Sequence, residues 1–427
     1  MGGQKRVVIL SAEAGFGHRS AARAIAAALE ELYGAQCHTD IINPLAAPRA
    51  PAILRNTASD YDRMVREMPD LYRLGYEASD AAVPSALVER ALTMMLLPVL
   101  RDTIKRYQPS VLVTTYPIYQ APLGAAMAQL GVAIPLFTVV TDLVSVHRLW
   151  FCEAADYTLV PTDEVGELAL QAGLQPEQVR VTGIPVSPQL ARPVADRAAL
   201  RRSLGLQPNG WVLLAVGSRR ARRLPLAIQA VNHSGFALQL LVVSGGDPER
   251  YAHYRATEWR LPSKVMDFAH NMPDLMHAAD CILCKAGGLI VTEALACGLP
   301  MLLVDVIPGQ ETGNAAYVDT REAGALCQDS LSVLETLCHW FLQDGAELAE
   351  RARAARAGAS ACGLRGGRAG LCVCSARAGP AARETPLGGS TPCLACGAGR
   401  QPRRPGLAER VKRSFSSGSR IGYSAIA

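Results

Sequence analysis

Short apolar runs alternate with amphipathic, helix-like stretches along most of this 427-residue chain. The apolar runs in its first part are RVVILSA, CHTDIINPL, VLVTTY, PLFTVVTD, YTLVP and VRVTGIP, and HRSAARAIAAALEELYG is typical of the helices between them. Apolar strands separated by helices form parallel sheets covered on both faces, because each parallel crossover needs a helix to return the chain. The pattern predicts a doubly wound α/β lobe over residues 1–187.

The same pattern restarts after a Pro- and Arg-containing stretch at residues 188–208, which we interpret as an interdomain linker. WVLLAVG, ALQLLVVSGGD, KVMDFA, DCILCK and PMLLVDV predict a second Rossmann-like lobe over residues 209–357. The length favours two lobes, because 427 residues exceed one ordinary core. A composition of 49% hydrophobic and 19% charged residues excludes a wholly disordered chain. The sequence contains no uncharged apolar run long enough to predict a membrane-spanning helix.

The positive charge is concentrated in residues 358–427. Ten Arg and one Lys face only Glu384 and Glu409 there, a net +9, whereas the whole chain carries +5 and residues 1–357 therefore carry −4. Gly, Pro, Ala and Ser dominate this segment, which has little periodicity and holds five of the twelve cysteines, so we expect a disordered basic tail. At the other end, the apolar stretch after Lys5 and Arg6 is too short for a signal peptide, which predicts a cytoplasmic protein.

The carboxyl ends of the predicted strands hold the residues of interest, because ligands of doubly wound sheets bind there. After the first strand, Gly15 and Gly17 permit a tight turn into a helix and a close backbone approach to a ligand. His18 follows and is a candidate proton acceptor near neutral pH, with helix capping or packing as an equal alternative. Asp40 stands where a nicotinamide-binding lobe would hold its ribose-binding acid, which keeps a minor dinucleotide hypothesis open.

The strongest local signal is DCILCKAGGLIVTEALACGLPMLLVDV, a strand, a Gly-Gly turn, a helix and a further strand. Gly287 and Gly288 expose backbone N–H groups at a helix start, where the helix dipole favours a diphosphate. Glu293, about a turn and a half into the helix, is a candidate acceptor for ribose hydroxyls, and its alternative is a solvent-facing helix residue.

Three further strand ends carry polar or aromatic candidates. Gly217 and Ser218 with the Arg residues after them suit a pyrophosphate, although a solvated basic helix start explains them equally well. Phe268 would stack on a base or fill the core, and composition favours the core. The candidates whose amide or carboxylate groups can form hydrogen bonds with sugar hydroxyls are Gln310, Glu311 and Asn314.

Two metal-like patterns carry little weight. Asp60-Tyr61-Asp62 has the D-x-D spacing of some metal-dependent sugar transferases, but it does not follow an apolar strand, so we interpret it as helix surface. Cys393 and Cys396 have the spacing of half a zinc site without a second pair or a nearby His. We therefore expect neither a metal nor another cofactor, and no nucleic-acid partner.

Taken together, five segments resemble one family: SAEAGFGHRSAARAIAAAL, VVTDLVSVHRLWF, VTGIPVSP, CKAGGLIVTEALACGLP and PGQETGN. In this order they are similar to the monogalactosyldiacylglycerol synthases and the bacterial processive diacylglycerol glucosyltransferases. More distantly, the chain is similar to the lipid-linked N-acetylglucosaminyltransferase of peptidoglycan synthesis. The resemblance spans about residues 5–357 and implies a two-lobed GT-B fold with an active site in the cleft between the lobes.

The resemblance also implies an inverting transfer of a hexose from a UDP-sugar, held by the second lobe, to diacylglycerol entering through the first. By motif, His18 becomes the catalytic base, Gly287 and Gly288 the phosphate loop, and Glu293 the ribose ligand. Gln310, Glu311 and, less directly, Asn314 become donor-sugar ligands. The segment TDLVSVHRLW brings Asp142 and His147 to the cleft, and Pro185 to Pro188 match the hinge.

A lipid acceptor implies peripheral attachment to an anionic membrane surface. Two other hypotheses remain open: a non-catalytic or degenerate nucleotide-sugar or lipid-binding member of the same fold, and an NAD-linked oxidoreductase. The choice between glucose and galactose, the processivity and the oligomeric state do not follow from the sequence.

Overall fold

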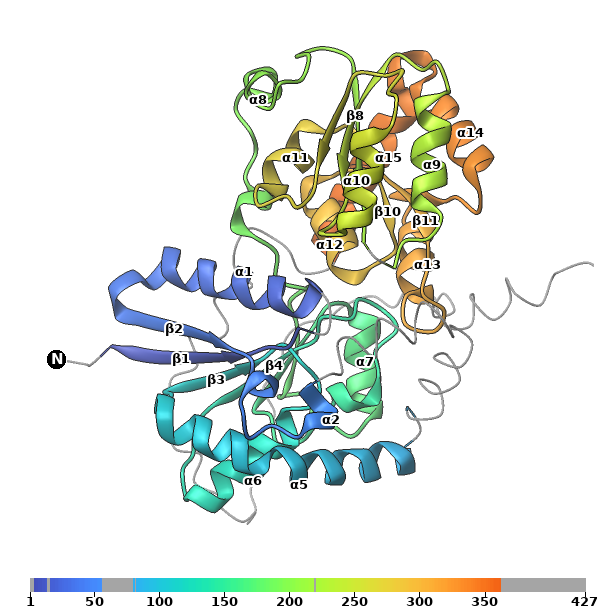
Figure 1. Ribbon diagram of the computed structural model, residues 1–427. Coiled ribbons are helices and arrows are strands. Elements are labelled where there is room, and N and C mark those ends of the chain that lie inside the picture. The colour runs from blue at the N-terminus through green and yellow to red at the C-terminus, as the bar shows by residue number, and fades with distance from the viewer. Residues whose placement is uncertain (1–3, 14–15, 56–79, 81, 219, 362–427) are drawn as a thin grey trace, which may run out of the picture. The chain divides into compact units, whose positions relative to one another are not determined.

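The computed structural model describes residues 4–13, 16–55, 80, 82–218 and 220–361. Its elements form two sheets of six strands, all paired in parallel, with helices between consecutive strands (Figure 1). The predicted architecture of two doubly wound Rossmann-like lobes is confirmed.

The first sheet has the strand order β2-β1-β3-β4-β5-β6. Its strands are β1 (Lys5–Leu10), β2 (Cys37–Ile42), β3 (Val111–Thr114), β4 (Leu136–Val139), β5 (Tyr157–Val160) and β6 (Val179–Val181). Its helices are α1 (Phe16–Tyr33), α2 (Ala52–Arg55), α5 (Ala82–Tyr107), α6 (Gln120–Leu130) and α7 (Asp163–Gln171), and its 3₁₀ turns are η1 (Gly34–Gln36), η2 (Pro44–Ala46) and η3 (Arg148–Trp150). Helix α1 lies on one side of the strands, and α5 and α6 lie on the other (Figure 1).

The second sheet has the order β12-β11-β10-β7-β8-β9. Its strands are β7 (Trp211–Val216), β8 (Leu238–Val243), β9 (Ser263–Met266), β10 (Cys281–Lys285), β11 (Met301–Asp305) and β12 (Gly324–Leu326). Its helices are α9 (Leu224–Asn232), α10 (Pro248–Ala256), α11 (Met272–Ala278), α12 (Gly288–Cys297), α13 (Thr312–Thr320), α14 (Ser330–Phe341) and α15 (Ala346–Ala361), with the 3₁₀ turn η5 (Gln343–Gly345). The last turn of α15 overlaps the tail that the sequence predicts from residue 358.

Each sheet is buried on both faces, as the continuous apolar runs predict. In the second sheet, Ile282 and Leu303 belong to the core on one face, whereas Leu283 and Leu302 belong to the core on the other. Successive side chains of a strand point to opposite faces, so such runs need a helical layer on both sides.

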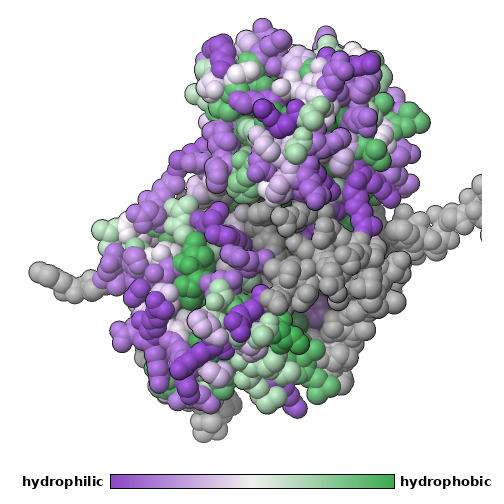
Figure 2. Space-filling view, viewed as in Figure 1, coloured by the Kyte–Doolittle hydropathy of each residue, from purple (hydrophilic) through white to green (hydrophobic). Residues whose placement is uncertain are grey.

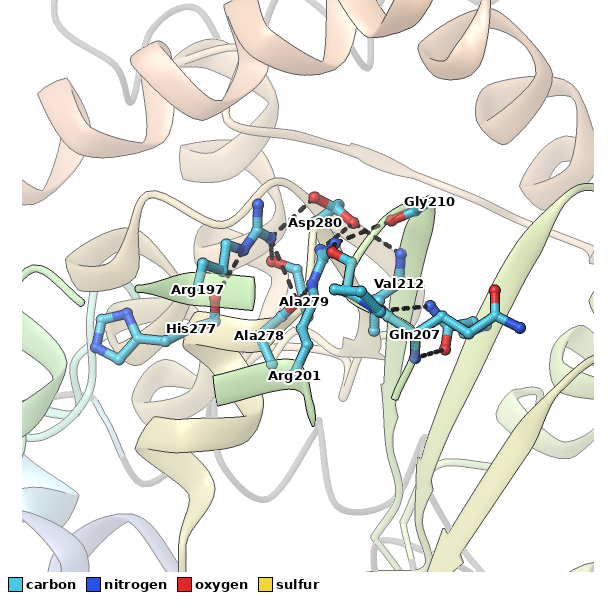
Figure 3. A network of polar contacts seen from close by, with 11 residues as sticks. Arg197, Arg201, Gln207, Gly210, Val212, His277, Ala278, Ala279 and Asp280 are labelled. Carbon is cyan, nitrogen blue, oxygen red and sulfur yellow. Dashed lines mark hydrogen bonds and ion pairs between the residues drawn. The ribbon is translucent and has the colours of Figure 1, made fainter. Parts of the chain in front are cut away.

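The predicted linker contains η4 (Pro188–Ala191) and α8 (Arg197–Ser203). Figure 3 shows how α8 is fixed to the second lobe. Asp280 accepts from Arg201 at 2.8 Å through one carboxylate oxygen and pairs with Arg197 at 2.8 Å through the other. Arg201 is buried, and its guanidinium also donates to the carbonyl oxygens of Pro208, Gly210 and Ala278. A buried guanidinium is tolerated only with such partners, so this end of the linker is anchored to the second lobe.

Candidate functional site

Each sheet has one point at which the strand order reverses: between β1 and β3 in the first sheet, and between β7 and β10 in the second. At such a point the crossovers on the two sides leave toward opposite faces and open a crevice at the carboxyl ends of the strands. His18 follows β1 and Thr115 follows β3, while Gly217 follows β7 and Lys285 ends β10. The candidate residues therefore flank both reversal points.

His18, in the first turn of α1, is held through one ring nitrogen. Its Nδ1 lies 2.8 Å from the carbonyl oxygen of Thr115 and 2.8 Å from Oγ1 of Thr141. A carbonyl oxygen only accepts, so Nδ1 carries the hydrogen and Nε2 of the neutral ring keeps its lone pair. Burial lowers the pKa of His18, which Asp142 opposes and Arg220 reinforces. The imidazole is therefore neutral near pH 7 and has the protonation state of a general base.

Asp142 acts on His18 through its charge and contacts two other residues. Its Oδ2 accepts from the indole Nε1 of the buried Trp150 at 2.7 Å, and its Oδ1 lies 3.5 Å from Nε2 of Gln310. The His18 ring also packs edge-on against Tyr116, with 4.9 Å between ring centroids. Trp150 and Gln310 hold this carboxylate, and its negative charge opposes the lowering of the pKa of His18 and so favours the protonated ring.

Gly287 and Gly288 form the turn between β10 and α12, and the Gly287 N–H donates to the Lys285 carbonyl oxygen at 2.7 Å. Gly287 is the N-cap residue of α12, and no side chain caps the helix there. A Cβ on Gly288 would lie 3.1 Å from the carbonyl oxygen of Thr141, so the first lobe approaches this turn closely. The N–H groups of the first helical turn have no partner inside the helix and form a site suited to a phosphate.

Two polar residues at the start of α13, Glu311 and Asn314, have protein partners. Glu311 pairs with Lys285 through Oε1 and accepts from the Ile307 backbone N–H at 2.9 Å through Oε2. Asn314 donates from Nδ2 to the Ala286 carbonyl oxygen at 3.0 Å. Both side chains are buried, so they support the glycine turn as well as being candidates for sugar contacts.

At the end of β7, Gly217 and Gly245 pack back to back. Gly245 has φ of +78°, and a Cβ there would lie 2.2 Å from the Gly217 carbonyl oxygen, so no larger residue fits. Oγ of Ser218 is buried and has no hydrogen-bond partner within the described residues. Sequence reasoning overlooked Gly245 and Gly246, although the strand-terminal SGGD was a usable signal.

Phe268 is 42% exposed, so the core-filling alternative is wrong. A Cβ on Gly246 would lie 3.8 Å from its ring, and the ring of His270 meets it edge-on at 5.1 Å between centroids. An exposed aromatic ring beside a glycine turn has the geometry of a stacking surface for a nucleobase.

Glu293 is only partly exposed, which argues against the solvent-facing alternative. Burial raises its pKa to about 7. Within the described part of the chain, the structure gives its carboxylate no hydrogen bond or ion pair. A buried carboxylate without a donor is unfavourable until a ligand supplies one.

The other candidates occupy different environments. His147 caps η3 by accepting from the Leu149 backbone N–H at 3.1 Å, and burial lowers its pKa. Gly17 faces α12, since its Cβ would lie 3.9 Å from Cβ of Leu289. Asp40 is paired with Arg6 at 2.7 Å, so its carboxylate is already engaged and nothing here favours the dinucleotide hypothesis. Gly15, Asp60-Tyr61-Asp62, Cys393 and Cys396 lie outside the described residues, among which no group of three His, Cys, Asp or Glu is arranged to hold a metal ion.

Comparison with known proteins matches both lobes. Residues 18–186 match the family described as monogalactosyldiacylglycerol (MGDG) synthase, and residues 211–361 match the glycosyltransferase family 28 C-terminal domain. A probable monogalactosyldiacylglycerol synthase 3 from Oryza sativa subsp. japonica is 32% identical over 354 residues, covering 81% of this chain and 69% of that protein. This chain belongs to the monogalactosyldiacylglycerol synthase family. The MGDG synthase of Spinacia oleracea is 31% identical over 347 residues, covering 79% of this chain. The chain spans about two thirds of the length of these curated MGDG synthases, 66% of the spinach protein and 64% of the Nicotiana tabacum one.

Solved structures of known proteins confirm the fold expected of an MGDG synthase. HepE of Anabaena, in complex with UDP and glucose, has a TM-score of 0.51 at 15% identity, covering 84% of this chain and 95% of that one. The UDP-GlcNAc 2-epimerase of Neisseria meningitidis bound to UDP-GlcNAc has a TM-score of 0.55 at 13% identity, and the match covers 87% of this chain and 98% of that one. At these identities the likeness establishes the GT-B architecture alone.

Proposed function

We propose that the protein transfers a hexose from a UDP-sugar to diacylglycerol at a membrane surface, with inversion at the anomeric carbon. The observation that carries the proposal is the 2.8 Å contact between Nδ1 of His18 and the Thr115 carbonyl oxygen, which assigns the ring hydrogen to Nδ1 and leaves Nε2 as the basic nitrogen. The names of the family members favour galactose as the transferred hexose.

The donor would occupy the second lobe. Because the Gly287 N–H donates to the Lys285 carbonyl oxygen at 2.7 Å, the diphosphate would accept from the Gly288 amide and its neighbours in the first turn of α12, and would lie beside Gly217 and Ser218. Glu293 would accept from the ribose hydroxyls, which supply the donors that its half-buried carboxylate lacks. The base would stack on Phe268, and Gln310, Glu311 and Asn314 would border the sugar.

The reaction would be a single displacement. Nε2 of His18 removes the proton of the acceptor hydroxyl while that oxygen attacks the anomeric carbon and the bond to UDP breaks. Asp142, fixed by Trp150, stabilises the imidazolium that forms. The helix amides stabilise the charge that develops on the leaving diphosphate. An α-linked UDP-hexose would give a β-glycosyl diacylglycerol.

Release of UDP tests whether the protein is an enzyme. We expect UDP to appear from UDP-galactose only when diacylglycerol is present, at a rate that rises with the lipid concentration. UDP-galactose binding without any lipid-dependent release would leave the non-catalytic hypothesis in its place.

We further propose that α2 and the N-terminal half of α5 lie at the membrane. In α5, Leu96, Val99 and Leu100 are buried, so the apolar stretch from residue 91 to 100 is largely core. Ile53, Leu87 and Met94 instead are 73%, 61% and 73% exposed. In Figure 2 green hydrophobic residues gather on the lower part of the first lobe, where α2 and α5 lie in Figure 1. No helix among the described residues is long and apolar enough to cross a bilayer.

Vesicle sedimentation tests this attachment. Residues 1–357 carry −4 and the remainder +9, so the basic segment should supply the attraction to anionic lipid, with each basic group at the surface contributing about 1 kcal/mol. We expect salt-sensitive binding to anionic vesicles that weakens when the chain is ended at Ala361. The binding that remains should be insensitive to salt and should fall further when Leu87 and Met94 are replaced by Ser. Failure of the full chain to sediment at low salt would contradict a membrane-bound acceptor.

A further inference from the structure

We propose that Lys285 binds the diphosphate of the donor, a role that rests on the proposed function. Lys285 is the last residue of β10, and its side chain is only 13% exposed. Its Nζ would lie 3.2 Å from a Cβ placed on Gly287, the N-cap residue of α12. The ammonium group is therefore fixed directly beside the N-terminus of this helix.

This position is electrostatically unfavourable without an anion. The N-terminus of a helix carries a partial positive charge, so an ammonium group there is repelled. Glu311 supplies one compensating carboxylate through Oε1, but its Oε2 is engaged by the Ile307 N–H. The single carboxylate of Glu311 thus faces both the Lys285 ammonium group and the positive end of the α12 dipole.

The donors of Lys285 point to the same conclusion. An ammonium group has three N–H donors, and among the described residues Glu311 is the acceptor that the structure gives it. Little water reaches a side chain with this exposure, so the remaining donors need an acceptor. A diphosphate bound at the Gly288 amide and the first turn of α12 would place its oxygens within reach of Nζ. Lys285 would then bridge Glu311 and the phosphate and stabilise the leaving group as its charge increases.

The alternative is that Lys285 only holds Glu311 in place. The two roles predict different affinities of the variants for UDP, a ligand that carries the diphosphate and lacks the sugar. If Lys285 contacts the diphosphate, Lys285→Met should weaken UDP binding, whereas Glu311→Gln should not, because it keeps the ammonium group and removes a nearby negative charge. If the ion pair is merely structural, both substitutions should weaken UDP binding alike.

Calorimetric titration of the full chain with UDP and with uridine decides between them. We expect Lys285→Met to weaken UDP binding about tenfold or more and to change uridine binding less than twofold. Glu311→Gln should leave UDP affinity within threefold or improve it. Lys264→Met, which removes an exposed lysine of β9 bound to the Leu204 carbonyl oxygen, is the matched control and should change neither.

Three results would overturn the role of Lys285: unchanged UDP affinity in Lys285→Met, equal losses in Lys285→Met and Glu311→Gln, or an equal loss of uridine affinity. If Lys285→Met does not fold, as thermal unfolding will show, Glu311→Gln and Lys285→Arg decide. A large loss of UDP affinity in Glu311→Gln would contradict the proposal. UDP affinity within about fivefold of wild type in Lys285→Arg would support it. A wild-type protein that binds no UDP would overturn both this role and the proposed function, whereas the three results above leave the proposed function standing.

Discussion

Replacing His18 by alanine is expected to lower turnover by about 10²- to 10⁴-fold, the usual contribution of a proton-transfer group. UDP affinity should change by no more than a few-fold, because in the proposed reaction the imidazole acts on the acceptor hydroxyl, and its Nδ1 is bound within the first lobe. Steady-state kinetics and calorimetry on the same preparation measure the two quantities. The exposed His339 of α14 offers a matched control, since His339→Ala should alter neither.

The pH profile adds a second check on His18. A base acts only when unprotonated, and burial lowers the pKa of this imidazole from its usual value of about 6.5. Turnover should therefore persist below pH 6.5 and decline only at more acidic pH, and that acidic decline should be absent from the residual activity of His18→Ala. Retained turnover in the variant would reassign His18 to packing of the α1 N-terminus.

Loss of the Glu293 carboxylate is expected to weaken donor binding by about 10- to 150-fold, the range for removing a charged hydrogen-bond acceptor. The pKa of about 7 makes this contribution depend on pH. In the proposed complex the ionised carboxylate accepts from the ribose hydroxyls, so wild-type affinity for UDP should rise from pH 6 to pH 8. Titration of Glu293→Ala should show the lower affinity, and Glu293→Gln should remove the rise. An affinity that is equal in wild type and Glu293→Ala at pH 8 would exclude the ribose contact.

Stability should change in the opposite direction at Glu293. Its pKa is raised on folding, so the folded chain binds more protons than the unfolded chain between about pH 4.5 and pH 7, and stability falls as pH rises through that window. Glu293→Gln should therefore raise the melting temperature at pH 8 relative to wild type and have little effect near pH 4.5. This pattern distinguishes a ligand-binding carboxylate from one that stabilises the fold.

The strand pattern predicted most of the fold because parallel strands buried on both faces are apolar along their whole length. The strand it missed, β12, has three residues, Gly324–Leu326, and lies at the edge of the second sheet. A Cβ on Gly324 would lie 2.2 Å from the Met301 carbonyl oxygen, so close packing rather than apolar content selects that glycine. Three residues, one of them a glycine, are too few to show the pattern of apolar residues by which the other strands were recognised.

The candidate site was predictable only in part. Glycines and polar residues at strand ends are visible as local motifs, which is how His18 and the Gly287-Gly288 turn were found. Thr115 and Thr141 were not found, because they lie 97 and 123 residues from His18 and meet it only through the order of the strands. Lys285 was missed for a related reason, since its carboxylate partner is 26 residues away at the end of a neighbouring loop.

In the proposed reaction, the transferred hexose forms a β-glycosidic bond to diacylglycerol. The most direct measurement is nuclear magnetic resonance of the lipid product after incubation of the full chain with UDP-galactose and diacylglycerol in vesicles. We expect one galactosyl diacylglycerol with a β-anomeric proton signal for each UDP released, and a loss of both in His18→Ala. An α-linked product, or UDP release without a glycolipid, would contradict the proposed reaction.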